Sequence, residues 1–87
     1  MYTHKLSVKV DKAFKKYLRK DPLQKEAVLK KIEQILNNPR QYKPLKWPQA
    51  GERRVHIGSF VLTFEIIEEE KVVRLLDYDH HDKIYKK

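Results

Sequence analysis

Arginine and histidine side chains that could hold an anion and move protons lie in two short stretches of the chain. Arg54 and His56 stand two residues apart in the first stretch, and His80 and His81 are adjacent in the second. A guanidinium pairs with phosphate or carboxylate through parallel hydrogen bonds. An imidazole changes charge between about pH 5 and 8, so it can act as an acid or a base. Neighbouring strand residues point to opposite faces, so at most one of the two adjacent histidines can face such a site.

These histidines do not form the pattern of a metal site. The sequence has no cysteine, and its histidines show neither the helical spacing nor the fourth ligand of a zinc site. We therefore expect no metal and no other cofactor. A plainer interpretation stays open, in which Arg54 and His56 are solvated strand side chains and the adjacent histidines form a solvated strand end.

The charge of the chain is concentrated in its first part. The 87 residues carry a net charge of +8, and residues 1–54 hold 15 basic and 5 acidic side chains. Such an excess favours a polyanionic partner, either a nucleic acid or an acidic protein, although a solvated lysine-rich surface would have the same composition. No apolar run approaches the ~18 to 20 residues of a membrane span, and the start lacks the apolar core of a signal peptide. We therefore expect a cytoplasmic protein with no membrane partner.

Two helices are expected in the first half of the chain, after a first strand from Tyr2 to Val8. The first helix is indicated by apolar residues spaced i, i+4, i+7 and i+8, namely Val10, Phe14, Tyr17 and Leu18. The second begins at Asp21-Pro22 and ends at Asn37-Asn38-Pro39. Its apolar stripe consists of Leu23, Ala27, Val28, Ile32, Ile35 and Leu36. The short connection predicts an antiparallel helical hairpin, followed by a loop over residues 39–51.

From residue 53 the apolar period changes to two, which predicts strands. Turns at Gly58-Ser59 and Glu68-Glu69-Glu70 separate three of them. The last strand, Val72 to Tyr78, breaks strict alternation and should be central or bulged.

We expect one domain over residues 1–87, of the α+β class and order β-α-α-β-β-β. The helical hairpin should pack on one face of a twisted, mainly antiparallel four-stranded sheet. The residues expected on that face are Val55, Ile57, Phe60, Leu62, Phe64 and Ile66, and those expected on the opposite, uncovered face are Arg54, His56, Val61, Thr63 and Glu65.

Three segments resemble motifs of one protein family. The stretch from Arg53 to Ile66 is similar to the hairpin "basic, hydrophobic, Gly, aromatic, Arg, hydrophobic, hydrophobic, aromatic" of the RelE/ParE toxin superfamily, and particularly of its archaeal RelE-like members. The stretch from Leu76 to Tyr85 resembles that family's closing "His-Arg-x-x-x-Tyr", and Pro44-Leu45-Lys46 resembles its "x-Leu-x-Gly" loop, with Trp47 where glycine is usual. The order and spacing of these motifs cover nearly the whole chain.

The resemblance implies the toxin of a type II toxin–antitoxin system. RelE-type members cut messenger RNA on the ribosome without a metal, by attack of a ribose 2′-OH on the adjacent phosphate, whereas ParE-type members inhibit gyrase. The implied partners are the ribosome, messenger RNA and a small acidic antitoxin encoded next door, and a homodimer is left open. Two alternatives remain: a RelE/ParE-fold protein that binds ribosome, RNA or gyrase without cleavage, and a solitary remnant acting only through protein contacts.

Two arginines of the family's site are replaced by other residues in this sequence. The arginine after the hairpin aromatic falls on Val61, which cannot hold a phosphate, and the closing arginine falls on His81, which can still act. The implied catalytic residues are Arg54, His56, His81 and Tyr85, and the implied RNA- or phosphate-binding residues are Lys12, Lys16, Lys46, Arg53 and His80. Trp47 is expected to anchor its loop in the core rather than to stack on a base.

Overall fold

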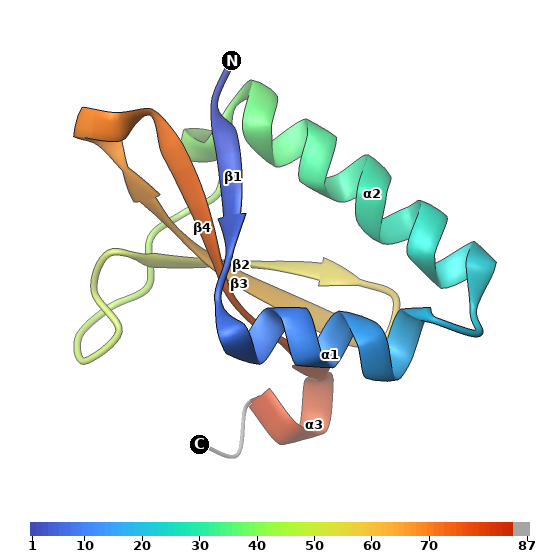
Figure 1. Cartoon of the computed structure of the whole chain (residues 1–87). Helices are drawn as coiled ribbons and strands as arrows, with labels where there is room; N and C mark the ends of the chain where they lie inside the picture. The colour runs from blue at the N-terminus through green and yellow to red at the C-terminus, as the bar shows by residue number, and fades with distance from the viewer. Residues whose placement is uncertain (85–87) are drawn as a thin grey trace.

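A computed structural model describes residues 1–84 and shows a helical hairpin against a four-stranded sheet (Figure 1). Its elements are β1 (Thr3–Leu6), α1 (Val8–Leu18), α2 (Pro22–Asn37), β2 (Glu52–Ile57), β3 (Phe60–Ile67), β4 (Val72–His80) and α3 (His81–Ile84), with 3₁₀ turns at Pro39–Gln41 and Glu68–Glu70. The strand order is β1-β4-β3-β2, with β1 parallel to β4 and the other two pairs antiparallel. The predicted class and the mainly antiparallel sheet are confirmed.

Both long helices begin at side-chain caps. The Val10 amide donates to Ser7 Oγ at 3.0 Å, and the Gln24 amide donates to Asp21 Oδ1 at 3.1 Å. Because Ser7 is the cap, α1 starts at Val8 and β1 ends at Leu6, so the prediction that the first strand reaches Val8 is wrong. None of the helices among residues 1–84 combines the length and the apolar character that crossing a bilayer requires.

The core lies between the helical hairpin and one face of the sheet. The predicted apolar alternation is confirmed, since Val55, Ile57, Leu62 and Phe64 are buried there and Phe60 and Ile66 pack against them. The helices contribute Val10, Leu18, Val28, Ile32 and Ile35. The rings of Phe60 and Tyr78 stack with centroids 5.0 Å apart.

A β-bulge in β4 decides which side chains reach the other face. Phe64 pairs with Leu75 and Thr63 pairs with Asp77, so Leu76 is the extra residue. Strict alternation from Leu75 would have turned Asp77 toward the helices. The bulge instead brings Asp77 level with Thr63 on the face away from the core. Strand β4 is thus both central, as its apolar doublets predict, and bulged.

The face opposite the hairpin is partly covered, which corrects the prediction that it is open. Val61 is 0% exposed and Thr63 4% exposed, although both point away from the core. The chain turns back at His81, whose amide donates to the Ser59 carbonyl at 2.8 Å, and α3 then buries Ile84 to 2% exposure. The described part of the chain thus ends in a short helix that lies against β3 and β4.

Glu68 joins three separate segments at one corner of the fold. Its carboxylate accepts hydrogen bonds from Tyr2 Oη at 2.9 Å, from Arg40 Nη2 at 2.7 Å and from Lys71 Nζ. These donors, led by Lys71 and then Arg40, lower the pKa of Glu68 from 4.5 to about 2. The corner thus ties Tyr2, just before β1, and the turn after α2 to the β3–β4 connection.

We expect the free energy of unfolding to fall less steeply with decreasing pH in Glu68→Gln than in wild type. The folded chain holds this carboxyl at a pKa of about 2 instead of 4.5, so the unfolded chain takes up the proton first as the pH falls. The contribution of Glu68 is full above about pH 4.5 and is lost between there and about pH 2. Urea unfolding measured across this pH range should show that wild type loses free energy of unfolding more steeply than the variant. Glu69→Gln, an exposed neighbour, should keep the wild-type slope, and parallel curves for wild type and Glu68→Gln would contradict the assignment.

Candidate active site

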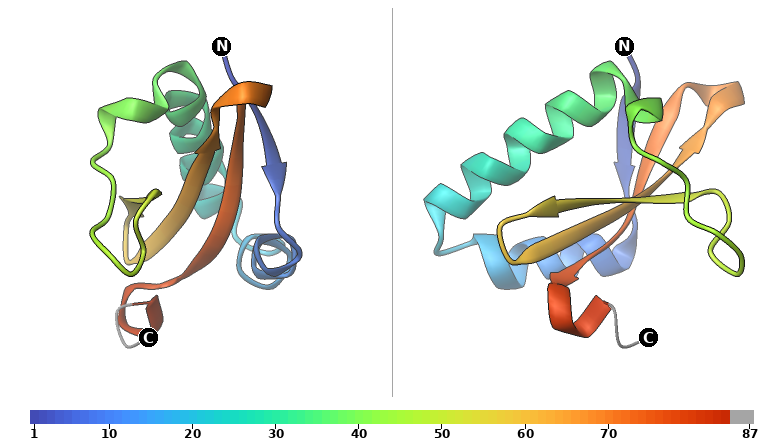
Figure 2. Two further views of the ribbon diagram at one scale, coloured as in Figure 1. Left: turned by 90° about the vertical axis from the view of Figure 1, so that its left-hand side faces the viewer. Right: turned by 180° about the vertical axis from the view of Figure 1, so that it is seen from behind.

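Two imidazoles meet where β2 and α3 approach one another. His56 extends from β2 opposite Val61, and His81 begins α3. Their ring centroids are 5.8 Å apart, with the ring planes tilted by 36°. Both side chains lie at the surface, where a ligand can reach them. Figure 2 shows α3 at the end of β4, turned back beside the sheet.

Arg54 lies on the same face as His56, two residues further from the hairpin turn, opposite Thr63. It lines a cavity of about 240 Å³, which is bounded by Lys9, Gln49, Glu52, Arg54, Thr63, Leu76, Asp77 and Ile84. The cavity is thus walled by α1, α3 and the loop before β2. It brings a guanidinium, an ammonium and two carboxylates together, and Arg54 shares its face of β2 with His56.

Acidic residues that the sequence motifs did not indicate belong to the site. Lys9 Nζ lies 3.1 Å from Asp77 Oδ2, and Asp79 Oδ1 accepts a hydrogen bond from Tyr17 Oη at 2.9 Å. The signal for them was the broken alternation of β4, because the bulge is what turns Asp77 to this side. These carboxylates hold one cation and one hydroxyl of α1 against β4.

The structure brings some predicted RNA-binding residues to this face and directs others elsewhere. Lys12 and Lys16 line a hollow of about 190 Å³ that shares Lys9 and Asp77 with the first cavity. Lys46 is exposed on the loop before β2. His80 packs against the Phe60 ring, with centroids 5.4 Å apart. His80 thus contacts a ring of the core side, whereas His81 contacts His56.

Of the two remaining predicted residues, Arg53 lies on the other side of the sheet from Arg54. Arg53 pairs with Phe64, on the side of the helices, and its Nε donates to the Tyr42 carbonyl at 2.8 Å. Arg53 therefore holds the loop before β2 and is not brought to the face of Arg54. Tyr85 lies outside the described residues. Val61, where the family has an arginine, is fully buried beneath the site.

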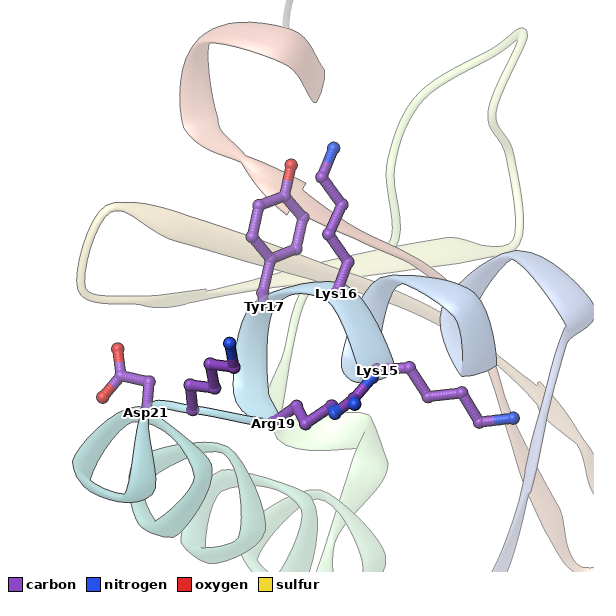
Figure 3. Close-up of a pocket in the computed structure, with 6 residues that line it drawn as sticks. Lys15, Lys16, Tyr17, Arg19 and Asp21 are labelled. Atoms are coloured by element: carbon purple, nitrogen blue, oxygen red, sulfur yellow. The ribbon is translucent and has the colours of Figure 1, made fainter.

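A second basic region lies at the end of α1. Lys15, Lys16, Tyr17, Arg19, Lys20 and Asp21 surround a pocket of about 420 Å³ (Figure 3). It holds four cationic side chains against one carboxylate, which suits a polyanion. In Figure 3, Lys16 and Tyr17 point to one side of the helix and Lys15 to another, so the charge extends around the end of α1. Within residues 1–84, no cluster of three or more histidine, aspartate or glutamate side chains could hold a metal ion.

Comparisons with known proteins give a consistent result over nearly the whole chain. A family model described as the ParE toxin of the type II toxin–antitoxin system parDE matches residues 2–85. An uncharacterized protein of Methanosarcina mazei is 49% identical over 86 residues, covering 98% of this chain and 100% of its own. A candidate toxin of Methanocaldococcus jannaschii designated RelE4 is 44% identical over 88 residues, covering 100% and 94%. The fold is similar to a chain in the intact E. coli RelBE toxin–antitoxin complex, with a TM-score of 0.77, 19% identity and coverage of 92% and 96%.

Proposed function

This chain belongs to the RelE/ParE superfamily of type II toxin–antitoxin toxins, and from this premise we propose that it cleaves messenger RNA on the ribosome. The observation that carries the proposal is the pair of imidazoles 5.8 Å apart, on the face that also holds Arg54. Two groups able to exchange protons beside one cation are what phosphodiester cleavage by an internal 2′-OH requires.

The proposed chemistry needs only the RNA and side chains of this chain. One of His56 and His81, in its neutral form, takes the proton of a ribose 2′-OH as that oxygen attacks the adjacent phosphorus. The other, protonated, gives its proton to the departing 5′-oxygen. The products are a 2′,3′-cyclic phosphate and a 5′-hydroxyl, so atoms and charge balance. Arg54 stabilises the additional negative charge of the phosphorane. By its family position, Tyr85 would orient the phosphate or stack on a base.

Induction in a bacterial host followed by primer extension on translated messages tests this proposal. Wild type should produce new ends inside coding regions, and the joint variant His56→Ala, His81→Ala should not. An absence of new ends with wild type, at a level that stops growth, would contradict cleavage.

A protein of this superfamily that binds without cutting is the second candidate, and Val61 is the observation that favours it. This side chain is fully buried and apolar where the family carries an arginine, so no guanidinium reaches the phosphate from β3. Val61→Arg is a poor test, because it would force a charge into a closed site. Blocked supercoiling by purified gyrase with translation unimpaired would favour this candidate in its ParE form.

The proposal includes a small acidic antitoxin as partner, and the groove between α1 and α2 suits one. This groove, of about 310 Å³, is lined by the apolar residues Phe14, Leu18, Val28 and Leu29 and by the charged residues Asp11, Lys15, Arg19 and Lys25. Asp11 pairs with Lys15 at 3.1 Å, so the rim keeps a net positive charge. Apolar floor and cationic rim together match an amphipathic acidic segment. Lys15 and Arg19 also line the basic pocket at the end of α1. A bound antitoxin would therefore neutralise charges that RNA would otherwise meet.

We expect Leu29→Lys to weaken antitoxin binding by about tenfold while leaving cleavage unchanged. Leu29 lines the groove and is already 56% exposed, so a lysine there disturbs the docking surface rather than the core. Titration calorimetry with the cognate antitoxin measures the effect. Leu23→Lys is the matched control, since Leu23 is on the same helix and 79% exposed but outside the groove. Equal losses from both variants would rule out this groove as the specific contact.

A further inference from the structure

Trp47 projects from the loop between α2 and β2 into solvent. Its side chain is 86% exposed, so the prediction that it anchors the loop in the core is wrong. Trp47 is the only tryptophan of the chain. Indole is among the side chains that gain most from burial against a partner, and its flat face suits another aromatic ring. A single exposed apolar side chain is ordinary on a protein surface, so binding by Trp47 is indicated by how the residue is held and by the charges around it.

The loop that carries Trp47 is held by hydrogen bonds on both sides of it. The Leu45 amide donates to the Glu52 carbonyl at 2.7 Å, and the Glu52 amide donates to the Gln49 carbonyl at 3.0 Å. The Gln49 amide in turn donates to the Lys46 carbonyl at 3.0 Å, closing a tight turn around Trp47. Because these hydrogen bonds fix the turn to the start of β2, the backbone that carries the indole is held in place. Because the loop is already held, it loses less conformational entropy when a ligand binds.

The same loop reaches the candidate active site. Gln49, two residues after Trp47, lines the cavity that contains Arg54. Lys43 and Lys46 are exposed beside the indole, and the loop has no acidic residue before Glu52. The loop is therefore cationic, and through Gln49 it reaches the cavity that Arg54 lines.

The surroundings of Trp47 fit a nucleic acid base better than a protein surface. Within its own loop, residues 42–51, Trp47 is the one large hydrophobic side chain that is exposed, whereas a tryptophan in a protein interface usually lies within a wider apolar core. A base offers an aromatic face of similar size, and its phosphates suit the neighbouring lysines. Stacking of this kind tolerates any sequence, because every base has such a face.

We propose that Trp47 is a stacking platform for an unpaired RNA base close to the cavity of Arg54. This inference deepens the proposed function, since it assigns the residue that positions the nucleotide chain beside the reacting phosphate. Trp47 is a positioning residue and has no part in proton transfer.

Intrinsic fluorescence of the full-length protein tests the proposal directly, because all tryptophan emission comes from Trp47. The probe is a short single-stranded RNA with 2′-O-methyl sugars, which cannot be cleaved. Emission should be quenched as this RNA is added, and heparin, a polyanion without bases, should leave it nearly unchanged. In filter binding with the same RNA, Trp47→Leu should bind about tenfold more weakly and Trp47→Phe close to wild type. Leu23→Ser, which removes another exposed apolar side chain, should bind like wild type.

Two results would overturn the proposal. One is RNA binding of wild type with unchanged emission and with equal affinity of Trp47→Leu. The other is quenching by the cognate antitoxin alone, which would make Trp47 a protein contact. Neither depends on cleavage, so failure of the stacking proposal is distinguishable from failure of the nuclease proposal.

Discussion

Replacing either His56 or His81 by alanine should slow cleavage of ribosome-bound messenger RNA by about 100-fold or more. Positioned acids and bases contribute about 10²- to 10⁴-fold each, and the two rings are 5.8 Å apart. A phosphodiester over the pair can therefore place its attacking oxygen by one ring and its leaving oxygen by the other. The cleavage rate of the double variant should fall by less than the product of the two single fold reductions, because the two groups act together on one transition state.

Single-turnover cleavage on programmed ribosomes measures this effect, and the chain offers two matched controls. Its other histidines are His4, on the outer strand β1, and His80, which packs on Phe60. Alanine at either position should leave the cleavage rate within about twofold of wild type, since neither ring faces the site. Loss of activity only in His56→Ala and His81→Ala would support the pair. Near-wild-type rates in both would exclude it.

A sulfur substitution in the substrate separates the two roles. When the departing 5′-oxygen is replaced by sulfur, the leaving group needs no protonation, so the variant that lacks the acid should recover most of its rate. The variant that lacks the base should stay slow with either substrate. Failure of the sulfur substrate to rescue either variant would mean that neither histidine is the acid.

The faces of the sheet could be predicted because strand alternation is a local property. Val55, Ile57, Leu62 and Phe64 are buried under the helices as their spacing indicated. The covering of the opposite face was missed because it depends on a contact between distant parts of the chain. Alternation says that Val61 points away from the helices, but it cannot say that Ile84 returns over the same face.

Two features of the site show why its other residues were harder to predict. Broken alternation in β4 indicated a bulge or a central strand, yet only the observed register shows that Leu76 is the extra residue and that Asp77 joins Thr63. Trp47 was expected in the core because apolar residues are usually buried. Cores consist mainly of apolar residues, but an apolar residue need not lie in the core, since much of every folded surface is apolar.

Its position on β2 makes Arg54 the central cation of the proposed mechanism. Arg54 occupies the same face of β2 as His56 and lines a cavity on that face. Val61, on the neighbouring strand, supplies no charge. We therefore expect the guanidinium of Arg54 to stabilise the extra charge of a phosphorane.

We accordingly expect Arg54→Met to lower the cleavage rate by about 10²- to 10³-fold, as removal of a preorganised donor does elsewhere. Arg54→Lys keeps the charge but not the planar pair of donors, so it should recover only part of the loss. Arg53→Met is the matched control, because the adjacent guanidinium faces the helix side and bonds to the Tyr42 carbonyl. It should lower the thermal midpoint while sparing the rate per folded molecule. Equal rate losses at both positions would show that the effect reflects general destabilisation of β2 and not phosphate binding by Arg54.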